Sequence, residues 1–333
     1  MGRRAQRLLA IITVLVALPT IILFFPILLA GAVVVDAGGR LFRFPSVRLL
    51  LFAIVYLVHS WVGLGRAASL RLHELTGRFR HDGEGQAEHY RRIQAWWASS
   101  LLTWARRLLN VRFDLGDTSV LPAHGFILIS RHASMVDALL PAEIVASGLG
   151  RFVHYVLKHE LQWDPNLNIY GHRLGNYFVR RDGDGDAEAD AIARFADRSR
   201  PGSALVIFPE GTYATPTRQR QIRDSLARKG LTDLVALADE LDHLLPPKPA
   251  GTLALLASQP RLDVVVVGHV GLEGVTDAGL RRLLPLRHPV VVRWWVHARA
   301  SVPAGGDEQI AWLNDQWRTL DRWVGSVAAE RTT

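Results

Sequence analysis

The stretch GFILISRHASMVD, residues 125–137, joins an uninterrupted apolar run to a short polar segment. An apolar run of this length is typical of a strand that is buried on both faces of a sheet. Similar short runs recur along the chain, separated by segments of helical composition: VRFDLGD, FVHYVL, NYFVR, SALVIF, DVVVVGHV and PVVVRWWVHA. The alternation predicts an α/β domain with a mainly parallel central sheet flanked by helices.

His132 and Asp137 follow the expected strand 125–130, and functional groups gather at the carboxyl ends of strands in such sheets. Five residues along a regular helix would place the two side chains about 140° apart. Direct contact therefore requires an irregular first turn. With such a turn, Asp137 would accept a hydrogen bond from one ring nitrogen and leave the other as a general base. Taken alone, the pair is more often structural than catalytic.

Two further strand ends carry polar groups. SALVIFPEGT, residues 203–212, runs an apolar segment into a turn that contains Glu210, Gly211 and Thr212. LGNYFVRR, residues 174–181, ends a short strand with two arginines, and guanidinium groups suit a phosphate ligand through paired hydrogen bonds. Each segment on its own also fits an ordinary surface turn with solvated side chains.

As a set, these segments resemble the glycerolipid acyltransferases, the lysophospholipid and 1-acylglycerol-3-phosphate acyltransferase family. HASMVD matches the H-x4-D signature, GNYFVRR matches G-x-x-F-[IV]-x-R, and FPEGT matches F-P-E-G-T, in the order of the family. VLKHELQWDPNLNIYGH, LLPPKPAGTLALL and a tryptophan-containing C-terminal segment extend the resemblance over roughly residues 93–324.

The resemblance implies one-step transfer of a fatty acyl group to the free hydroxyl of 1-acyl-sn-glycerol 3-phosphate, giving phosphatidate. The donor would be acyl-CoA or acyl-carrier protein, with no cofactor and no metal. By analogy His132 is the general base and Asp137 orients its ring. The residues expected to hold the acceptor or order the pocket are Lys158, Arg181, Glu210, Gly211 and Thr212.

The chain departs from the family at positions that bear on the acceptor. Arg131 stands where many members have Asn, and Tyr213 stands where many have Arg, with Arg218 as a distant substitute. VVVVGHVG lacks a proline that is frequent in the family. A lysophospholipid with a larger head group therefore stays open as the acceptor. A catalytically silent membrane lipid-binding protein is the alternative of another class. A nucleic-acid module is disfavoured, because the arginines are not interleaved with aromatics along a strand.

The N-terminal region predicts a membrane hairpin. Residues 8–35 contain no charge over 28 positions, more than the roughly 20 that cross a bilayer. Residues 49–65 form a shorter charge-free run. The first run exceeds the roughly 7–15 apolar residues of a signal peptide, which argues against cleavage. With arginines on the flanks and in the connecting segment, we expect spanning or re-entrant helices in the inner membrane and the catalytic domain on its cytoplasmic face.

The domain boundaries follow from these segments. We expect an anchor over residues 1–66, a polar connector over 67–92 and an acyltransferase domain over 93–333, which opens with an amphipathic helix. The chain has 333 residues, a net charge of +8 and no cysteine, so disulfides and thiolate chemistry are excluded. The acidic stretch RRDGDGDAEAD and the residues after it have Ala187 and Ala193 where an EF-hand calcium loop needs its Gly and Glu, and it is interpreted as a polar loop leading into a helix.

Overall fold

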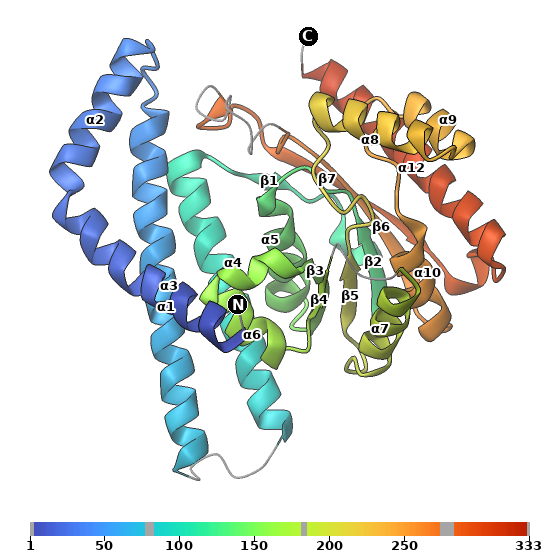
Figure 1. Ribbon diagram of the computed structural model, residues 1–333, viewed down its shortest axis with the longest axis horizontal. Coiled ribbons are helices and arrows are strands. Elements are labelled where there is room, and N and C mark those ends of the chain that lie inside the picture. The colour runs from blue at the N-terminus through green and yellow to red at the C-terminus, as the bar shows by residue number, and fades with distance from the viewer. Residues whose placement is uncertain (1–2, 77–82, 181–184, 274–282, 332–333) are drawn as a thin grey trace.

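A computed structural model describes residues 3–76, 83–180, 185–273 and 283–331, which build one seven-stranded sheet (Figure 1). The strand order is β1-β7-β6-β2-β5-β3-β4. Every neighbouring pair is parallel except β6 and β7, which confirms the expected mainly parallel α/β fold. The strands are β1 Phe113–Asp114, β2 Phe126–Ser130, β3 Val153–Lys158, β4 Tyr177–Val179, β5 Ala204–Ile207, β6 Asp263–Val270 and β7 Val290–His297.

Strand β2 lies in the middle of the sheet because its side chains are apolar on both faces. Phe126 and Leu128 pack into one core cluster, whereas Ile127 and Ile129 pack into the cluster on the opposite face. Parallel neighbours β6 and β5 flank the strand on its two sides. The carboxyl end of β2, where the polar motif begins, therefore opens at the centre of the sheet edge.

Helices cover both faces of the sheet (Figure 1). One face carries α4 (Gly83–Leu109), α5 (Leu139–Pro141) and the π-helical turn η3 (Ala142–Gly148). The other face carries α7 (Gly185–Asp197), α10 (Pro249–Ser258) and α12 (Gly306–Glu330). The remaining elements are η1 Thr118–Val120, η2 Met135–Ala138, η4 His159–Trp163, α6 Pro165–Arg173, α8 Pro216–Arg228, α9 Thr232–Glu240 and η5 Arg299–Ser301.

The N-terminal region forms three helices, α1 (Arg3–Leu23), α2 (Phe25–Gly38) and α3 (Pro45–Leu75), and α2 folds back along α3 (Figure 1). In the described part of the chain, α1 and α3 are long and apolar enough to cross a membrane, judged by length and composition. The buried carboxylate of Asp36 accepts hydrogen bonds from the backbone N–H groups of Ser46 and Val47, which satisfies the first turn of α3.

The segment expected to be a polar connector, residues 67–92, is largely helical where the structure describes it. Helix α3 continues to Leu75 and α4 already begins at Gly83. Apolar residues stabilise these polar helix ends, since Leu70 of α3 and Tyr90 of α4 pack together in a small core cluster with residues of α6. The expected amphipathic helix over 93–110 is confirmed as the C-terminal part of α4, with its apolar side buried in the sheet-facing core.

Candidate active site

The polar motif after β2 forms an irregular turn rather than a regular helix. The 3-10 helix η2 begins directly after Ser134, whose hydroxyl accepts a hydrogen bond from the Val136 N–H at 3.2 Å. The Asp137 carboxylate in return accepts from the Ser134 N–H at 2.7 Å, completing a capping box. This tight first turn brings the side chains of His132 and Asp137 onto the same side, as their contact requires.

His132 and Asp137 are in direct contact, as predicted. Nδ1 of His132 lies 3.2 Å from Oδ2 of Asp137, and the same oxygen accepts from the Ala133 N–H at 2.6 Å. Burial opposes ionisation of Asp137, but His269, His132 and the Ser134 N–H outweigh it and lower the pKa of this carboxyl. With Nδ1 engaged by a carboxylate, Nε2 is the nitrogen left to act as a base.

Two aromatic rings border the imidazole of His132. The ring centroid of Phe208 lies 4.8 Å from that of His132, and the centroid of Tyr213 lies 4.4 Å from it. The ammonium of Lys158 lies 5.3 Å from the Tyr213 ring, and the guanidinium carbon of Arg218 lies 5.9 Å from it. Tyr213 therefore lies between the candidate base and two cations, within the range of cation–π attraction.

Glu210 binds the protein backbone on the inner wall of the site. Its Oε1 accepts from the His132 N–H at 2.8 Å, and its Oε2 accepts from the Leu245 N–H at 3.0 Å. The side chain is only 1% exposed. Burial raises the pKa of Glu210 to about 7, although the Arg131 guanidinium and both N–H groups favour the charged form. Within the described structure, Glu210 thus fixes the backbone of His132.

The turn after Glu210 holds a cluster of polar groups. Gly211 has a φ of +67°, in the region that favours glycine. A Cβ at this position would lie 3.3 Å from Nζ of Lys248, which marks how closely the lysine crosses the turn. The hydroxyl of Thr212 accepts a hydrogen bond from Nη1 of Arg218. The distant arginine considered from the sequence is therefore part of this cluster.

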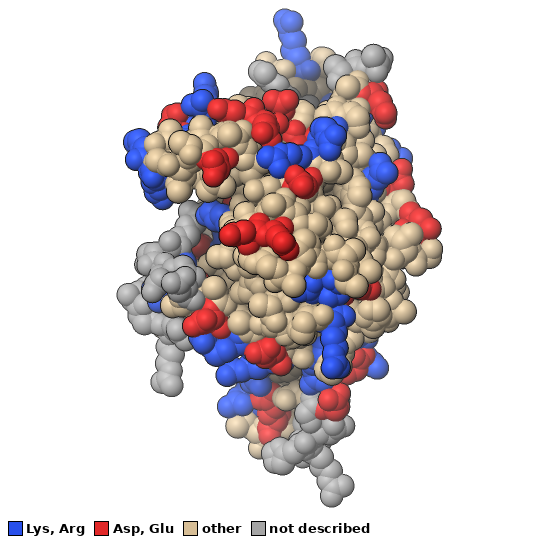
Figure 2. Space-filling model, turned by 90° about the vertical axis from the view of Figure 1, so that its right-hand side faces the viewer, with Lys and Arg blue, Asp and Glu red and all other residues tan. Residues whose placement is uncertain are grey.

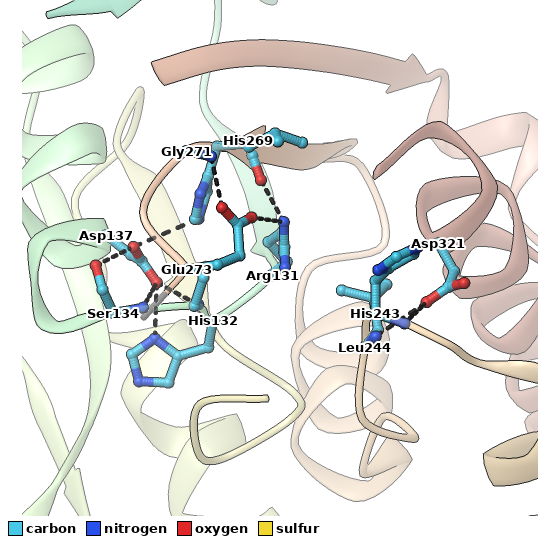
Figure 3. A network of polar contacts seen from close by, with 12 residues as sticks. Arg131, His132, Ser134, Asp137, His243, Leu244, His269, Gly271, Glu273 and Asp321 are labelled. Carbon is cyan, nitrogen blue, oxygen red and sulfur yellow. Dashed lines mark hydrogen bonds and ion pairs between the residues drawn. The ribbon is translucent and has the colours of Figure 1, made fainter. Parts of the chain in front are cut away.

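Arg131 does not face the site. Its side chain is 1% exposed and donates to Oε1 of Glu273 at 2.7 Å and to the carbonyl of His269 (Figure 3). The guanidinium therefore ties the end of β2 to the segment after β6. Of the two departures considered for the acceptor, only Tyr213 borders the cavity described next.

A cavity of about 1230 Å³ runs past His132. Its apolar end is lined by residues of α3 and α4, namely Leu49, Phe52, Tyr56, Trp97 and Leu101. Its polar part contains Lys158, Arg180, Arg218, Lys229 and Lys248. The cavity thus combines a long apolar wall with a basic region beside one histidine, an arrangement that suits a molecule with an anionic head and an apolar chain.

The structure assembles most of the residues expected from the sequence. His132, Lys158, Glu210, Gly211 and Thr212 line the cavity, and Asp137 lies behind His132. Arg181 lies outside the described residues, as do the aspartates at 182 and 184.

Three residues were missed. Lys248 was quoted in a family segment without a role, and Phe208 was taken as part of a strand. His269 was not considered for the site, although a histidine within the apolar segment DVVVVGHV was a signal that the sequence offered.

Comparison with known families finds a match over the central part of the chain. Residues 112–247 match the family model described as Acyltransferase, and this range contains every residue predicted for the site. Over these residues the chain is similar to the acyltransferase family, which supports the resemblance to the glycerolipid acyltransferases that the motifs indicated.

Among solved structures, the chain is similar to the crystal structure of the 1-acyl-sn-glycerophosphate (LPA) acyltransferase PlsC from Thermotoga maritima. The sequence identity is 15%, the TM-score is 0.48, and the alignment covers 84% of this chain and 98% of that chain. No curated protein matches the chain in sequence.

Proposed function

We propose that the protein transfers a fatty acyl group from an acyl thioester to the free hydroxyl of 1-acyl-sn-glycerol 3-phosphate, giving phosphatidate. The observation that carries the proposal is the placement of His132. Buried Asp137 holds Nδ1 of its ring, and the ring borders a cavity that joins the apolar helices to a basic region. An acyltransferase domain with this cavity suits a phosphorylated lipid acceptor.

In this mechanism, Nε2 of His132 takes the proton from the acceptor hydroxyl as its oxygen attacks the thioester carbonyl carbon. The tetrahedral intermediate collapses, the C–S bond breaks, and the leaving thiolate takes the proton back from the imidazolium. Asp137 stabilises the charged imidazole through its contact with Nδ1. The Glu210 carboxylate keeps the backbone of His132 in place throughout.

The charge of the cavity favours an acceptor with a free phosphate. Lys158 and Lys248 come from different segments that meet at the polar part, and Arg218 reaches the same region from α8. Charge-assisted hydrogen bonds from such groups are the usual means of holding a phosphate. The face drawn in Figure 2 shows basic and acidic side chains interspersed, rather than a single-sign basic surface of the kind that nucleic acid requires.

Membrane association belongs to the proposal because α3 contributes to the cavity wall. Leu49, Phe52 and Tyr56 of this apolar helix line the same space as His132. A lipid acceptor would then reach the base directly from the bilayer. The basic N-terminal flank is consistent with anchoring in the inner membrane and a catalytic domain on the cytoplasmic side.

A lysophospholipid with a larger head group is the second candidate acceptor. The observation that favours it is Tyr213, whose neutral ring lies against His132 at a position beside the basic cluster. An aromatic ring there offers a surface on which a cationic head group packs. The two acceptors share one reaction and differ in what the polar part of the cavity binds.

The first test is the variant His132→Ala, assayed in purified form with a panel of lysolipid acceptors and with acyl-CoA and acyl-carrier protein donors. We expect product formation to fall by at least roughly a hundredfold, because the general base is lost. Mass spectrometry of the lipid products also identifies the preferred acceptor and donor.

His124→Ala is the matched control, since His124 is an exposed histidine at the start of the segment leading into β2 and should keep wild-type activity. Full activity of folded His132→Ala contradicts the proposed base. Lipid binding without product from the wild-type protein, with either donor, supports a silent lipid-binding protein instead.

A further inference from the structure

His269 occupies a position in β6 where the pattern calls for an apolar residue. Val265 and Val267 precede it at alternate positions and belong to the core cluster on the face that carries η2. His269 points to the same face and is 0% exposed. A polar imidazole at this depth is costly unless its nitrogens have partners.

The partner available to this ring is Asp137. Nε2 of His269 lies 3.5 Å from Oδ1 of Asp137, while Nδ1 of His132 lies 3.2 Å from the other carboxylate oxygen. Figure 3 shows the two imidazoles on opposite sides of the carboxylate. Among the described residues, neither nitrogen of His269 has a hydrogen-bond partner, and the contact with Asp137 is the nearest one that the structure records for Nε2. A shift of about half an ångström would bring the contact to Asp137 within hydrogen-bond distance.

We propose that His269 is a positioning residue, which donates its Nε2–H to Asp137 and holds that carboxylate against His132. The inference deepens the proposed function and rests on the role of His132 as the base. Asp137 is fully buried, and its Oδ1 otherwise accepts only the Ser134 hydroxyl among the described side chains, at 2.8 Å. His269 supplies a second donor on that side and so fixes the plane of the carboxylate.

The charges around His269 favour a neutral ring that acts as a donor. Burial lowers the pKa of His269, and the nearby Arg131 guanidinium lowers it further, whereas Asp137 and Glu273 oppose this. The titratable groups around His269 and its neighbours Asp137 and His132 include Arg131 after β2, Glu273 after β6, and Glu210 and Tyr213 after β5. A neutral donor withdraws some negative charge from Asp137 without replacing His132 as its cationic partner.

Removal of the His269 donor should change the pH dependence of the reaction in a definite direction. Without the His269 donor, the Asp137 carboxylate is more basic and stabilises the imidazolium form of His132 more strongly. The acid limb of the pH–rate profile then moves to higher pH. The carboxylate also loses one of the contacts that orient it, and kcat falls. Loss of packing alone would lower stability without moving the limb.

The experiment compares His269→Leu, which fills the site without a donor, with His269→Gln, which keeps an N–H donor. For His269→Leu we expect kcat to fall about tenfold, with KM little changed, and the acid limb to rise by roughly half a pH unit or more. His269→Gln should recover most of the activity, and the acid limb of its pH–rate profile should lie at the wild-type pH. Val265→Ala is the control for lost packing on the same face of β6, with an unchanged limb.

A second readout does not depend on turnover. The rate at which diethyl pyrocarbonate modifies His132, followed by peptide mass spectrometry, is measured across pH and gives the midpoint of its pH dependence. We expect the midpoint to rise in His269→Leu and to stay near wild type in His269→Gln. His269→Met replaces the Leu variant if the latter does not fold.

An unchanged midpoint in folded His269→Leu or His269→Met overturns the inference. A wild-type protein that transfers no acyl group refutes the proposed function instead, while the modification assay still tests His269.

Discussion

The carboxylate of Glu210 connects two backbone segments that are far apart in sequence. One oxygen accepts from the His132 N–H and the other from the Leu245 N–H. Both partners are donors, so the ionised form with two acceptor oxygens fits this position better than a protonated acid. Burial nevertheless raises the pKa of Glu210 to about 7. The protein thus keeps a costly buried charge in order to hold the backbone of the candidate base.

This raised pKa gives a pH dependence of stability. The folded protein binds the Glu210 proton more tightly than the unfolded chain does, so this group's contribution to the free energy of unfolding falls as pH rises toward 7. Glu210→Gln removes that dependence. Between pH 5 and pH 8, we expect the stability of the variant relative to wild type to rise by about 2 kcal/mol.

Denaturant unfolding of both proteins in detergent at the two pH values provides the measurement. A relative stability that stays constant or falls with pH would show that Glu210 is already charged at pH 5.

Among single residues, the contacts that could be predicted from the sequence are those between residues close together in the chain. His132 and Asp137 are five positions apart, and the motif carries the capping serine that shapes their turn. The role of Glu210 was not accessible, because its partners lie 78 and 35 residues away and are backbone groups. The meaning of Arg131 was also hidden, since its carboxylate partner Glu273 follows another strand.

Among the elements, the turn between β5 and α8 is the one that presents polar groups to the cavity. Gly211 adopts a positive φ there, and Lys248 lies directly over it. Gly230, after α8, has a similar φ of +70°, and a Cβ added there would meet nothing within 4 Å. The two glycines therefore separate the cost of backbone strain from the effect of displacing Lys248.

We expect Gly211→Ala and Gly230→Ala to lose a similar stability, about 1 to 2 kcal/mol each, because both force an L-residue into the left-handed region. Only Gly211→Ala should also lose activity, by about tenfold or more, since the new methyl group moves Lys248 and the turn beside His132. Thermal unfolding and initial rates on the same preparations test this. Equal activity of the two variants would mean that Lys248 does not need its present position.

The strands were predicted well because their signal is a local one. Each of the seven expected apolar segments contains a strand, and in β2 every side chain is buried. The helical ends within the expected connector over 67–92 were not predicted, because they depend on distant contacts. Its composition is polar, but tertiary contacts of Leu70 and Tyr90 with α6 stabilise helical ends that composition alone does not predict. The antiparallel pairing of β7 with β6 was likewise not visible in the apolar pattern.

For the molecule as a whole, the decisive contact is between α3 and the catalytic domain. The hydroxyl of Tyr170 in α6 donates to the Gly63 carbonyl at 2.6 Å, and His59 lies 2.6 Å from the Ser100 hydroxyl of α4. The Tyr56 hydroxyl donates to Asp164 at the start of α6. Polar contacts along several turns of α3 therefore attach this apolar helix firmly to the domain.

Gly63 permits the close approach. A Cβ at this position would lie 2.3 Å from Oδ1 of Asn166, a buried side chain that donates to the Ser60 carbonyl. We expect Gly63→Ala to destabilise the docking of α3 by roughly 1 to 3 kcal/mol, seen as a lower unfolding temperature in detergent and lower activity.

Gly65→Ala, on the same helix with open space around it, is the matched control and should be neutral or slightly stabilising. Equal unfolding temperatures for the two variants would exclude tight docking at Gly63.

The attachment of α3 also fixes the position of the domain along this helix. Since Tyr56 of this helix lines the cavity and its hydroxyl is bonded to the catalytic domain, the domain cannot slide along the helix without breaking those bonds. In a bilayer, the height of His132 above the lipid tails would follow from where the apolar part of α3 settles. On the proposed function, bilayer thickness would then change the distance between a lipid's hydroxyl and Nε2 of His132, and so the rate of the reaction.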